Sequence, residues 1–334
     1  MLQHIKDELL NDVDKLIELL SHFGYCNFSV KPKYITFGRN EEGSKKSIVI
    51  QREKNEALIV HDYPKNIVCD VFNYIIREKH EPFRDVIQAA KQVVGIDENY
   101  APEEKYKPFG GFYHLIKNRI KQEVKTYDEN ILDKYKSHGN SRFLRDGISL
   151  EAQRYFNIGY DVESQSITIP IYSETGELIG VKCRRNCDDC EQKYWFDVPC
   201  QASQTLYGFS HNYEYLEGNT VYLFEAEKSV QQCWTMNYKN ALALGSSSIS
   251  KKQCQMILSL NPARVVFMHD QGLDFEIIKK NIKTLKTYGK MKEFSVSYWR
   301  PGDDVPSKAS ASDLGKERFK KALREELVEF EESC

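Results

Sequence analysis

The chain has 334 residues, with 47 Lys and Arg against 49 Asp and Glu and a pI near 6.5. This length predicts about two or three domains, and the balanced charge excludes a histone-like polycation but not a protein with a local basic groove. No stretch approaches the roughly 18 apolar residues of a membrane span, and the acidic N-terminus is unlike a signal peptide. Nine Cys at this density argue against a secreted disulfide scaffold. We expect a cytoplasmic globular protein that contains no membrane segment.

The N-terminal part predicts a helix, a small β-meander and two further helices. Apolar residues recur at spacings of three and four over residues 2–20, which indicates one amphipathic helix. Turn-like stretches separate three β-rich runs, Tyr34–Phe37, Ser47–Gln51 and Ala57–His61. Helical patterns follow at Val68–Arg77 and Phe83–Val94, and Gly95 is the expected end of the second.

The central part predicts a linker, a helix and a β-hairpin. Residues 97–111 are polar and rich in Pro and Gly, as in a linker. A long helix is expected over 112–137. The hydrophobic period then drops to two in Ser166–Tyr172 and Leu178–Cys183, which predicts paired strands around the turn Ser173–Gly176.

From residue 220 onward, strands and helices alternate. The strand-like runs are Val221–Phe224, Ala241–Leu244, Arg264–Met268 and Phe294–Tyr298, and the helical stretches lie near 228–237, 250–259 and 274–287. Such alternation is typical of right-handed βαβ units on a mostly parallel sheet. The tail, Ser312–Glu332, predicts a charged helix. The expected fold class is therefore α/β, with α+β N-terminal parts.

Acidic residues follow several of these strands. Ligands of parallel sheets gather at the carboxyl ends of the strands. The strand ends carry Glu225 and Glu227, Gly245 to Ser248, His269 with Asp270 and Asp274, and Asp303 with Asp304, with Asp313 further along. Clustered carboxylates repel one another unless a hard cation such as Mg²⁺ neutralises them, which favours phosphoryl or nucleotidyl transfer. The alternative is that these acids only cap helices in polar loops.

Ordered sequence segments resemble the DnaG-type primases. The run VYLFEAEKSVQQCW…ALALGSSSIS…ARVVFMHDQGLD is similar to a TOPRIM domain, the catalytic fold of bacterial-type primases, topoisomerases and some nucleases. Upstream, RFLRDGISLEAQRYFNIGYD, ITIPIYSETGELIGVKCRRN and KYWFDVPCQASQTLYGF resemble the primase segment that precedes TOPRIM. Together they cover roughly residues 141–315 in the order and spacing of that family.

The N-terminal part resembles the same family. KNIVCDVFNYIIREKHEPFRDVIQAAKQVVGI is similar to the helical end of the primase zinc-binding domain. Only Cys26 and Cys69 stand in this region, and two thiols cannot close a tetrahedral zinc site, so the resemblance implies a degenerate, metal-free domain. The implied domains are a zinc-ribbon-like domain (1–96), a linker (97–111), a primase-core subdomain with a basic strand (112–216), TOPRIM (217–310) and a C-terminal helix (311–334).

The resemblance implies catalytic, metal-binding acids at Glu225, Asp270 and Asp304. Two positions depart from the family pattern, because later acids of its motifs fall on Ser229 and Gly272. Asp274 and Asp313 are the candidates to replace them as metal ligands. The implied cofactor is Mg²⁺ or Mn²⁺.

The resemblance also implies a basic surface that holds the template backbone and the incoming triphosphate, a role that suits forked guanidinium groups. Its residues are Lys182, Arg184, Arg185, Lys193, Arg142 and Arg145. The alternative is a solvated strand edge. Cys183, Cys187, Cys190 and Cys200 include a CxxC in an acidic loop. Reduced thiols are expected there, and a structural Zn²⁺ is the alternative.

The sequence therefore predicts a phage-type DNA primase that polymerises ribonucleoside triphosphates on single-stranded DNA. The family implies a replicative helicase as a partner in trans. Two other functions stay open: a primase-derived accessory protein that binds single-stranded DNA or a replisome partner without polymerising, favoured by the departures at Ser229 and Gly272, and a TOPRIM nuclease using the same acids.

Overall fold

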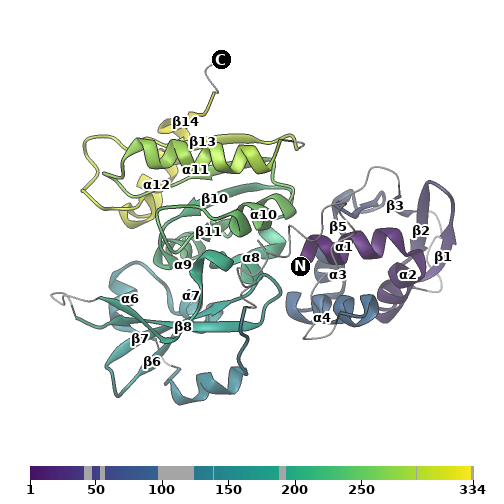
Figure 1. Ribbon diagram of the computed structural model, residues 1–334, viewed down its shortest axis with the longest axis horizontal. Helices are drawn as coiled ribbons and strands as arrows, with labels where there is room; N and C mark the ends of the chain where they lie inside the picture. The colour runs from purple at the N-terminus through teal and green to yellow at the C-terminus, as the bar shows by residue number, and fades with distance from the viewer. Residues whose placement is uncertain are drawn as a thin grey trace, which may run out of the picture.

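The protein is arranged in three lobes around three β-sheets (Figure 1). The computed structural model describes residues 1–40, 47–52, 57–96, 124–137, 139–187, 193–290 and 292–331. We call 1–96 the N-terminal lobe, 124–205 the middle lobe and 206–331 the parallel-sheet lobe. The expected mixed α/β class is confirmed. The predicted linker 97–111 and the first part of the predicted helix 112–137 lie outside the described residues.

The N-terminal lobe begins with two helices, α1 (Leu2–Asn11) and α2 (Val13–His22), where the sequence predicted one. The break lies at Asp12, whose backbone is extended with φ −116° and ψ 99°. The Asp12 carboxylate accepts hydrogen bonds from the backbone N–H groups of Asp14 and Lys15. An aspartate that caps a new helix in this way ends the preceding one, although the apolar spacing continues through it.

The sheet of this lobe is a five-stranded antiparallel meander in the order β1-β2-β3-β4-β5. Its strands are β1 (Cys26–Val30), β2 (Tyr34–Gly38), β3 (Ile48–Gln51), β4 (Ile59–Asp62) and β5 (Ile67–Asp70). The predicted helix over 68–77 is wrong at its start, because Asp70 ends β5 and caps α3 (Val71–Lys79). The prediction for α4 (Phe83–Val94) is confirmed, with Gly95 left-handed at φ 80°.

The middle lobe has a four-stranded antiparallel sheet, β6-β7-β8-β9, and short helices. The elements are η1 (Glu129–Lys134), α6 (Ser141–Arg145), α7 (Leu150–Tyr155), β6 (Gly159–Asp161), β7 (Ser166–Tyr172), β8 (Leu178–Arg185) and β9 (Tyr194–Val198). The predicted β7–β8 hairpin is confirmed. The predicted long helix is wrong over 124–137, where Tyr127 bridges to Leu178 and Lys136 to Tyr160 on either side of η1. Pairing with sheet neighbours overrides the local helical pattern there.

The parallel-sheet lobe has the strand order β11-β10-β12-β13-β14. The last turn of the middle lobe, η2 (Ala202–Gln204), leads into it. Its elements are α8 (Phe209–Leu216), β10 (Thr220–Phe224), α9 (Glu227–Thr235), β11 (Ala241–Ala243), α10 (Lys251–Ser259), β12 (Arg264–Phe267), α11 (Phe275–Tyr288), β13 (Ser295–Trp299), η3 (Ala311–Leu314), α12 (Lys316–Glu325) and β14 (Leu327–Glu329). β10 to β13 pair in parallel, which confirms the expected βαβ alternation.

The predicted tail helix is correct only over α12. The chain then forms β14, which pairs antiparallel with β13 from Ser297↔Glu329 to Trp299↔Leu327. The Trp299 indole N–H also donates to the Glu326 carboxylate at 2.8 Å, at the point where α12 turns into β14. Covering the edge of β13 outweighs continuing the charged helix.

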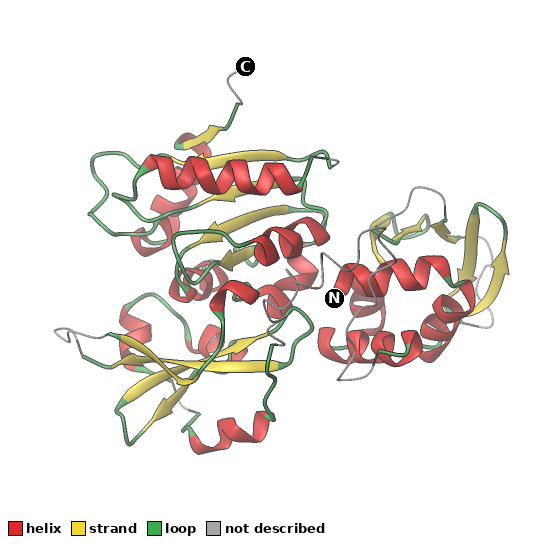
Figure 2. Ribbon diagram, in the orientation of Figure 1, coloured by secondary structure: helices red, strands yellow, loops and turns green. Residues whose placement is uncertain are grey.

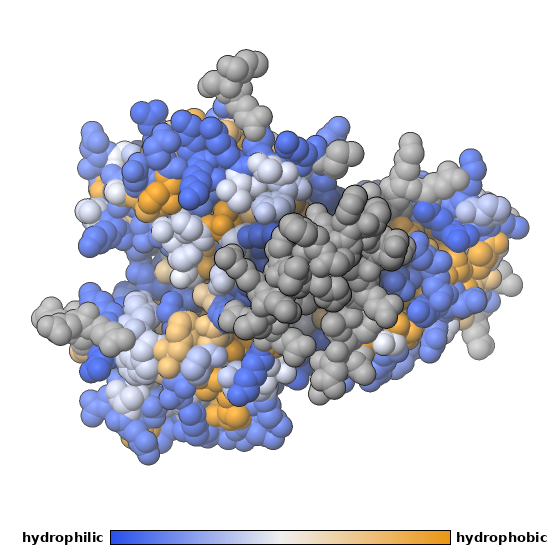
Figure 3. Space-filling view, in the orientation of Figure 1, coloured by the Kyte–Doolittle hydropathy of each residue, from blue (hydrophilic) through white to orange (hydrophobic). Residues whose placement is uncertain are grey.

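Helices cover both faces of the parallel sheet (Figure 2). Val221 and Leu223 face the side of α8, α10 and α11, whereas Phe224 packs with α9 and α12 on the other side. The outer surface of α11 is hydrophilic (Figure 3) and includes exposed Lys280 and Lys283. No helix in the described ranges is long and apolar enough to cross a membrane.

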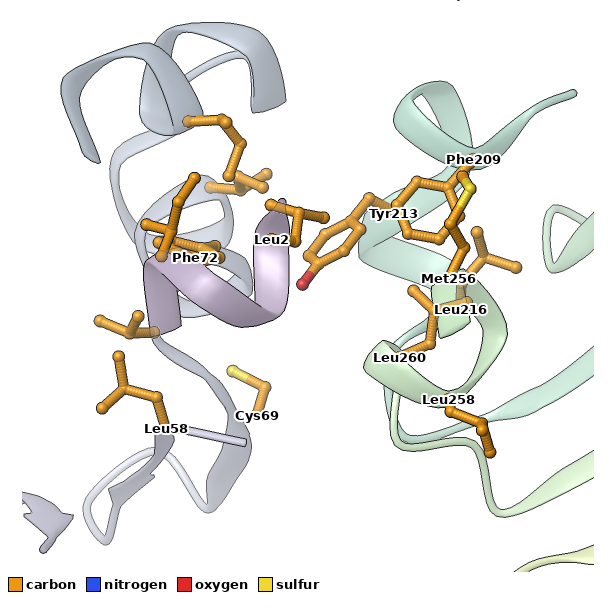
Figure 4. Packing of buried hydrophobic residues seen from close by; sticks show 14 of the residues in the cluster. Leu2, Leu58, Cys69, Phe72, Phe209, Tyr213, Leu216, Met256, Leu258 and Leu260 are labelled. Atoms are coloured by element: carbon orange, nitrogen blue, oxygen red, sulfur yellow. The ribbon is translucent and has the colours of Figure 1, made fainter. Parts of the chain in front are cut away.

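One apolar cluster runs continuously from the N-terminal lobe into the parallel-sheet lobe. Figure 4 shows Leu2 of α1 next to Tyr213 of α8, with Phe209 and Met256 beyond. All four side chains are buried. Shared apolar burial of this kind makes the two lobes one packed unit.

A buried ion pair lies in the same interface. The Lys6 ammonium, 1% exposed, contacts Asp70 Oδ2 at 2.6 Å. The Tyr213 hydroxyl donates to the same oxygen at 2.6 Å from the parallel-sheet lobe, and the backbone N–H of Asn73 donates to Asp70 Oδ1 at 2.8 Å. Asp70 therefore connects α1, α3 and α8 through one carboxylate.

The middle lobe is tied to the same assembly through the β7–β8 turn. The Glu174 carboxylate contacts the Met1 amino group at 2.8 Å and Lys252 of α10 at 2.7 Å. Burial raises the pKa of Glu174, but these two cations outweigh burial and the net pKa is lowered. Lys91 of α4 pairs with Glu177 on the same turn. Ion pairs from three lobes thus meet at one hairpin.

Loss of Lys6 is expected to destabilise the protein strongly. Lys6→Met leaves the Asp70 carboxylate buried without its cation, which typically costs about 3–5 kcal/mol. Lys15→Met is the control, because the Lys15 ammonium is only part-buried and its closest carboxylate lies 3.8 Å away, and such pairs are worth about 0–1 kcal/mol. Urea unfolding of both variants measures the difference. Equal losses would contradict the role assigned to the Lys6–Asp70 pair.

Candidate functional site

The site forms where two neighbouring parallel strands end. β10 and β12 pair in the register Leu223↔Phe267, so the residues that follow them reach the same edge of the sheet. Glu225 comes from the end of β10 and Asp270 from the end of β12. The backbone N–H of Asp270 donates to Glu225 Oε1 at 3.2 Å. The structure thus brings together two of the three acids predicted as catalytic.

The two carboxylates influence each other electrostatically. The pKa of Asp270 is raised to about 6. Burial is the main cause, repulsion from Glu225 and Asp313 adds to it, and attraction to Lys228 offsets only part of the increase. Burial also acts to raise the pKa of Glu225, but the contacts with His269 and the Asp270 N–H outweigh it, and the net pKa is lowered. Glu225 is therefore held ionised beside an aspartate that resists ionisation.

Asp313 lies near these acids and is already paired. Its Oδ1 contacts the Lys228 ammonium at 2.5 Å and accepts from Gln232 at 2.9 Å. Its Oδ2 accepts from the backbone N–H of Ser310 in a capping box of η3. Burial raises the pKa of Asp313, but Lys228 and these hydrogen bonds outweigh burial and lower it. Lys228 is thus engaged with Asp313.

Asp304 and Asp274 lie in other environments. Asp304 is exposed on the loop after β13. Its two carboxylate oxygens accept hydrogen bonds from Nε and Nη2 of Arg318, each at 3.2 Å. Asp274 is exposed and caps α11 by accepting the backbone N–H of Glu276 at 3.0 Å. Among the described residues, no three His, Cys, Asp or Glu side chains are grouped as a metal site. The structure does not bring Asp304 together with Glu225 and Asp270.

The two departures from the family pattern have local structural roles. The Ser229 hydroxyl is buried and donates to the Ser310 hydroxyl at 3.2 Å, which ties α9 to the loop before η3. Gly272 has φ +93°, a left-handed conformation that a side chain such as Asp adopts only with strain. The backbone there is therefore adapted to the absence of the second acid.

Lys182 reaches from β8 to the parallel-sheet lobe, and Arg184 lies on the same face of the strand. Lys182 forms a double contact with the Glu227 carboxylate, at 2.9 and 2.8 Å, where α9 begins. Arg184 lies 3.3 Å from Asp146 at an angle that makes no hydrogen bond, so both groups keep unsatisfied atoms. Glu227, the partner of Lys182, lies two positions after the acid Glu225. Lys182 is therefore close in the chain of contacts to the candidate site.

The remaining basic residues are distributed over other surfaces. Side chains alternate along a strand, so Arg185 lies on the face of β8 opposite Arg184, and its guanidinium stacks over Trp195 at 5.4 Å. Lys193 and Arg145 are exposed, and Arg142 is half-buried in α6. The predicted basic surface is therefore divided between two faces of the middle-lobe sheet and the helix beside it.

Cys183 and Cys200 are free thiols, Cys187 is disulfide-bonded, and Cys190 lies outside the described residues. The expectation of reduced thiols is therefore wrong for Cys187, and a disulfide sulfur cannot serve as a zinc thiolate. Burial raises the pKa of Cys200 to about 11 and also raises the pKa of Cys183. Zinc binds the thiolate, so both environments work against metal binding. Cys200 packs beside Gly180, three residues along β8 from Cys183, a separation of about 10 Å along a strand.

The acids fit a divalent cation. Glu225 and Asp270 offer carboxylate oxygens from adjacent strand ends, and Asp270 has a raised pKa that a bound cation would relieve. Mg²⁺ is commonly held by about one or two carboxylates while water and substrate phosphates fill its other positions. A third protein acid is therefore not required.

The chain superposes on solved structures of primases. No family model matches the chain. The zinc-binding and RNA polymerase domains of the Aquifex aeolicus primase superpose with a TM-score of 0.50 at 16% sequence identity, over 98% of this chain and 86% of that one. A DnaG primase catalytic domain bound to single-stranded DNA superposes with a TM-score of 0.50 at 16% identity, over 60% of this chain and 77% of that one.

A protein of known sequence also resembles the whole chain. The SPbeta prophage-derived uncharacterised protein YorJ of Bacillus subtilis strain 168 is 23% identical, over 97% of this chain and 96% of its own length. The structural likenesses establish the fold: the chain has the fold of the DnaG-type primases. The predicted resemblance to that family is confirmed at this level.

His269 and Asn281 are two further residues connected with the site, and the sequence pattern predicted a role for neither. The His269 ring contacts Glu225 Oε1 at 3.4 Å and Asn281 at 3.3 Å. The position of His269 directly before the strand-end acid Asp270 could have indicated its role from the sequence. Asn281 lies in the middle of α11, and only the packing of α11 against the sheet shows its connection to the site.

Without a divalent metal, Asp270→Asn is expected to become more stable relative to wild type as pH rises. The pKa of Asp270 is raised in the folded state, so the stability it contributes at low pH is lost as pH passes through about 6. Urea unfolding in EDTA at about pH 4.5 and about pH 7.5 measures the change. Saturating Mg²⁺ should then stabilise wild type more than the variant. A difference that is constant with pH would refute this environment for Asp270.

Proposed function

We propose that the protein is a metal-dependent DNA primase that synthesises short RNA primers on single-stranded DNA from ribonucleoside triphosphates. The observation that carries the proposal is the meeting of Glu225 and Asp270 at adjacent parallel strand ends, within a chain that has the DnaG primase fold. The parallel-sheet lobe would be its TOPRIM domain and the middle lobe its basic core subdomain.

Glu225 and Asp270 would hold Mg²⁺ or Mn²⁺. When bound, such an ion neutralises triphosphate charge and activates the primer hydroxyl. The rest of the catalysis is positioning and charge complementarity. Lys182 and Arg184 are the basic residues best oriented to hold triphosphate or template near these acids, because Lys182 contacts Glu227 of α9 and Arg184 lies on the same face of β8. Arg185, stacked on Trp195, would contact the DNA backbone further away.

The N-terminal lobe would be a metal-free counterpart of the primase zinc-binding domain. Its buried contacts through Asp70 and Leu2 support a fixed position against the catalytic lobe. The likeness to a prophage-derived protein supports a phage origin. The proposed role is therefore in phage DNA replication, with a host or phage helicase acting in trans.

A second candidate is a primase-derived accessory protein that binds single-stranded DNA without polymerising. Ser229 and Gly272 support it, because both positions have local structural roles where the family has acids. A TOPRIM nuclease would use the same two acids for hydrolysis.

The direct test is synthesis of labelled ribo-oligomers on single-stranded DNA with Mg²⁺ or Mn²⁺. Wild type is expected to make short products, and Glu225→Gln and Asp270→Asn are expected to lose at least about a hundredfold in rate, since loss of a second-shell partner alone costs about 10–100-fold. Asp304→Asn is the matched control and should lose less than about threefold, because its carboxylate is exposed and pairs with Arg318.

The outcomes separate the candidates. Salt-dependent DNA binding without product from wild type would favour the accessory protein, and nicking of the template would favour the nuclease. A loss in Asp304→Asn as large as in the other two would return Asp304 to the catalytic set predicted from the sequence.

A further inference from the structure

A buried histidine contacts the acid on which the proposed site depends. His269 lies at the end of β12, is 2% exposed and stacks on Phe267. Its Nδ1 lies 3.4 Å from Glu225 Oε1. This nitrogen is buried, and no hydrogen bond of good geometry satisfies it. A buried polar atom 3.4 Å from a carboxylate oxygen needs an explanation, because leaving it unsatisfied costs free energy.

The other ring nitrogen fixes which hydrogen-bonding role Nδ1 has. His269 Nε2 lies 3.3 Å from the Asn281 side-chain nitrogen. The orientation of that amide is set by backbone groups, because Asn281 Oδ1 accepts the N–H of Ile249 at 3.1 Å and its Nδ2 donates to the carbonyl of Ser247 at 2.7 Å. Asn281 therefore presents an N–H to His269 Nε2.

It follows that Nε2 accepts and Nδ1 carries the proton. A neutral imidazole has one donor and one acceptor nitrogen, so an acceptor Nε2 makes Nδ1 the donor. The doubly protonated ring would set two donors against each other at Asn281. The tautomer with a bare Nδ1, which a metal ligand requires, would do the same. His269 is thus directed to hold Glu225 rather than to bind a cation itself.

We infer that His269 is a positioning residue that donates Nδ1–H to Glu225 Oε1 and thereby turns the other carboxylate oxygen toward the cation. The Asp270 backbone N–H donates to the same Oε1 at 3.2 Å. Two donors on one oxygen leave Oε2 as the metal-facing atom. Asn281, anchored on the Ser247–Ile249 loop, determines the tautomer from α11. The inference rests on the proposed function in that it assigns the metal site of Glu225 and Asp270.

The tautomer can be read directly by NMR. Long-range ¹H–¹⁵N correlation of the whole metal-free chain should show the Nδ1–H tautomer for His269, with its signals assigned by their loss in His269→Asn. The Nε2–H tautomer would overturn the inference. This readout needs neither metal nor nucleotide, so it judges His269 even if the protein fails to make primers.

Mn²⁺ affinity, followed by EPR, tests the consequence for the site. His269→Phe keeps an aromatic ring but removes the donor, and should weaken Mn²⁺ binding about tenfold, as loss of a second-shell partner does. His269→Asn keeps an N–H near the Nδ1 position and should stay within about threefold of wild type. His211→Phe is the control and should not change Mn²⁺ affinity. His211 of α8 packs against Phe156 and Tyr172 of the middle lobe.

Equal losses in His269→Phe and His269→Asn would refute the donor role, as would unchanged binding in His269→Phe. Far-UV circular dichroism and urea unfolding of the metal-free variants establish that each is folded. If wild type binds no Mn²⁺, the proposed metal site fails, whereas the tautomer still decides the contact between His269 and Glu225.

Discussion

The parallel pairing of β10 with β12 is the constraint on which the site depends. It brings Glu225 and Asp270 to adjacent strand ends, where burial and mutual repulsion work against ionising both. Lys228, the cation that acts on Asp270, is engaged with Asp313, and the Asp270 N–H donates to Glu225 Oε1, which also lies 3.4 Å from His269 Nδ1. The protein thus stabilises one carboxylate and leaves the other short of positive charge. A divalent cation would supply the missing charge, which is why this edge of the sheet is the candidate centre.

The position of the N-terminal lobe depends on a different balance. Asp70 receives Lys6, Tyr213 and a backbone N–H inside an apolar cluster that both lobes share. Such a buried pair contributes specificity of arrangement more than net stability, because desolvation consumes most of the Coulomb energy. The lobe has the topology of a meander with helices, and apolar packing holds it against the parallel-sheet lobe.

The regular part of this structure could be predicted from the sequence. Strand and helix alternation after residue 220 identified β10 to β13, because long periodic segments follow local patterning. The errors occurred where local pattern and tertiary contact disagreed. Asp12 splits an apolar repeat by capping, the chain at 124–137 pairs with β6 and β8, and Leu327 joins a sheet edge. The sheet partners of 124–137 and of Leu327 are distant in sequence, whereas the Asp12 cap is a local contact that the continuous apolar spacing hides.

The candidate site was predictable to the same extent. Glu225 and Asp270 follow from strand ends in a parallel sheet, whereas the contact of Asp304 with Arg318 depends on how α12 packs.

The most direct test of the account is anomalous diffraction from crystals of the protein soaked in Mn²⁺. The account predicts a manganese peak between the carboxylates of Glu225 and Asp270, absent from Glu225→Gln. A peak at Asp304 or at Asp313, with none between those two acids, would contradict it.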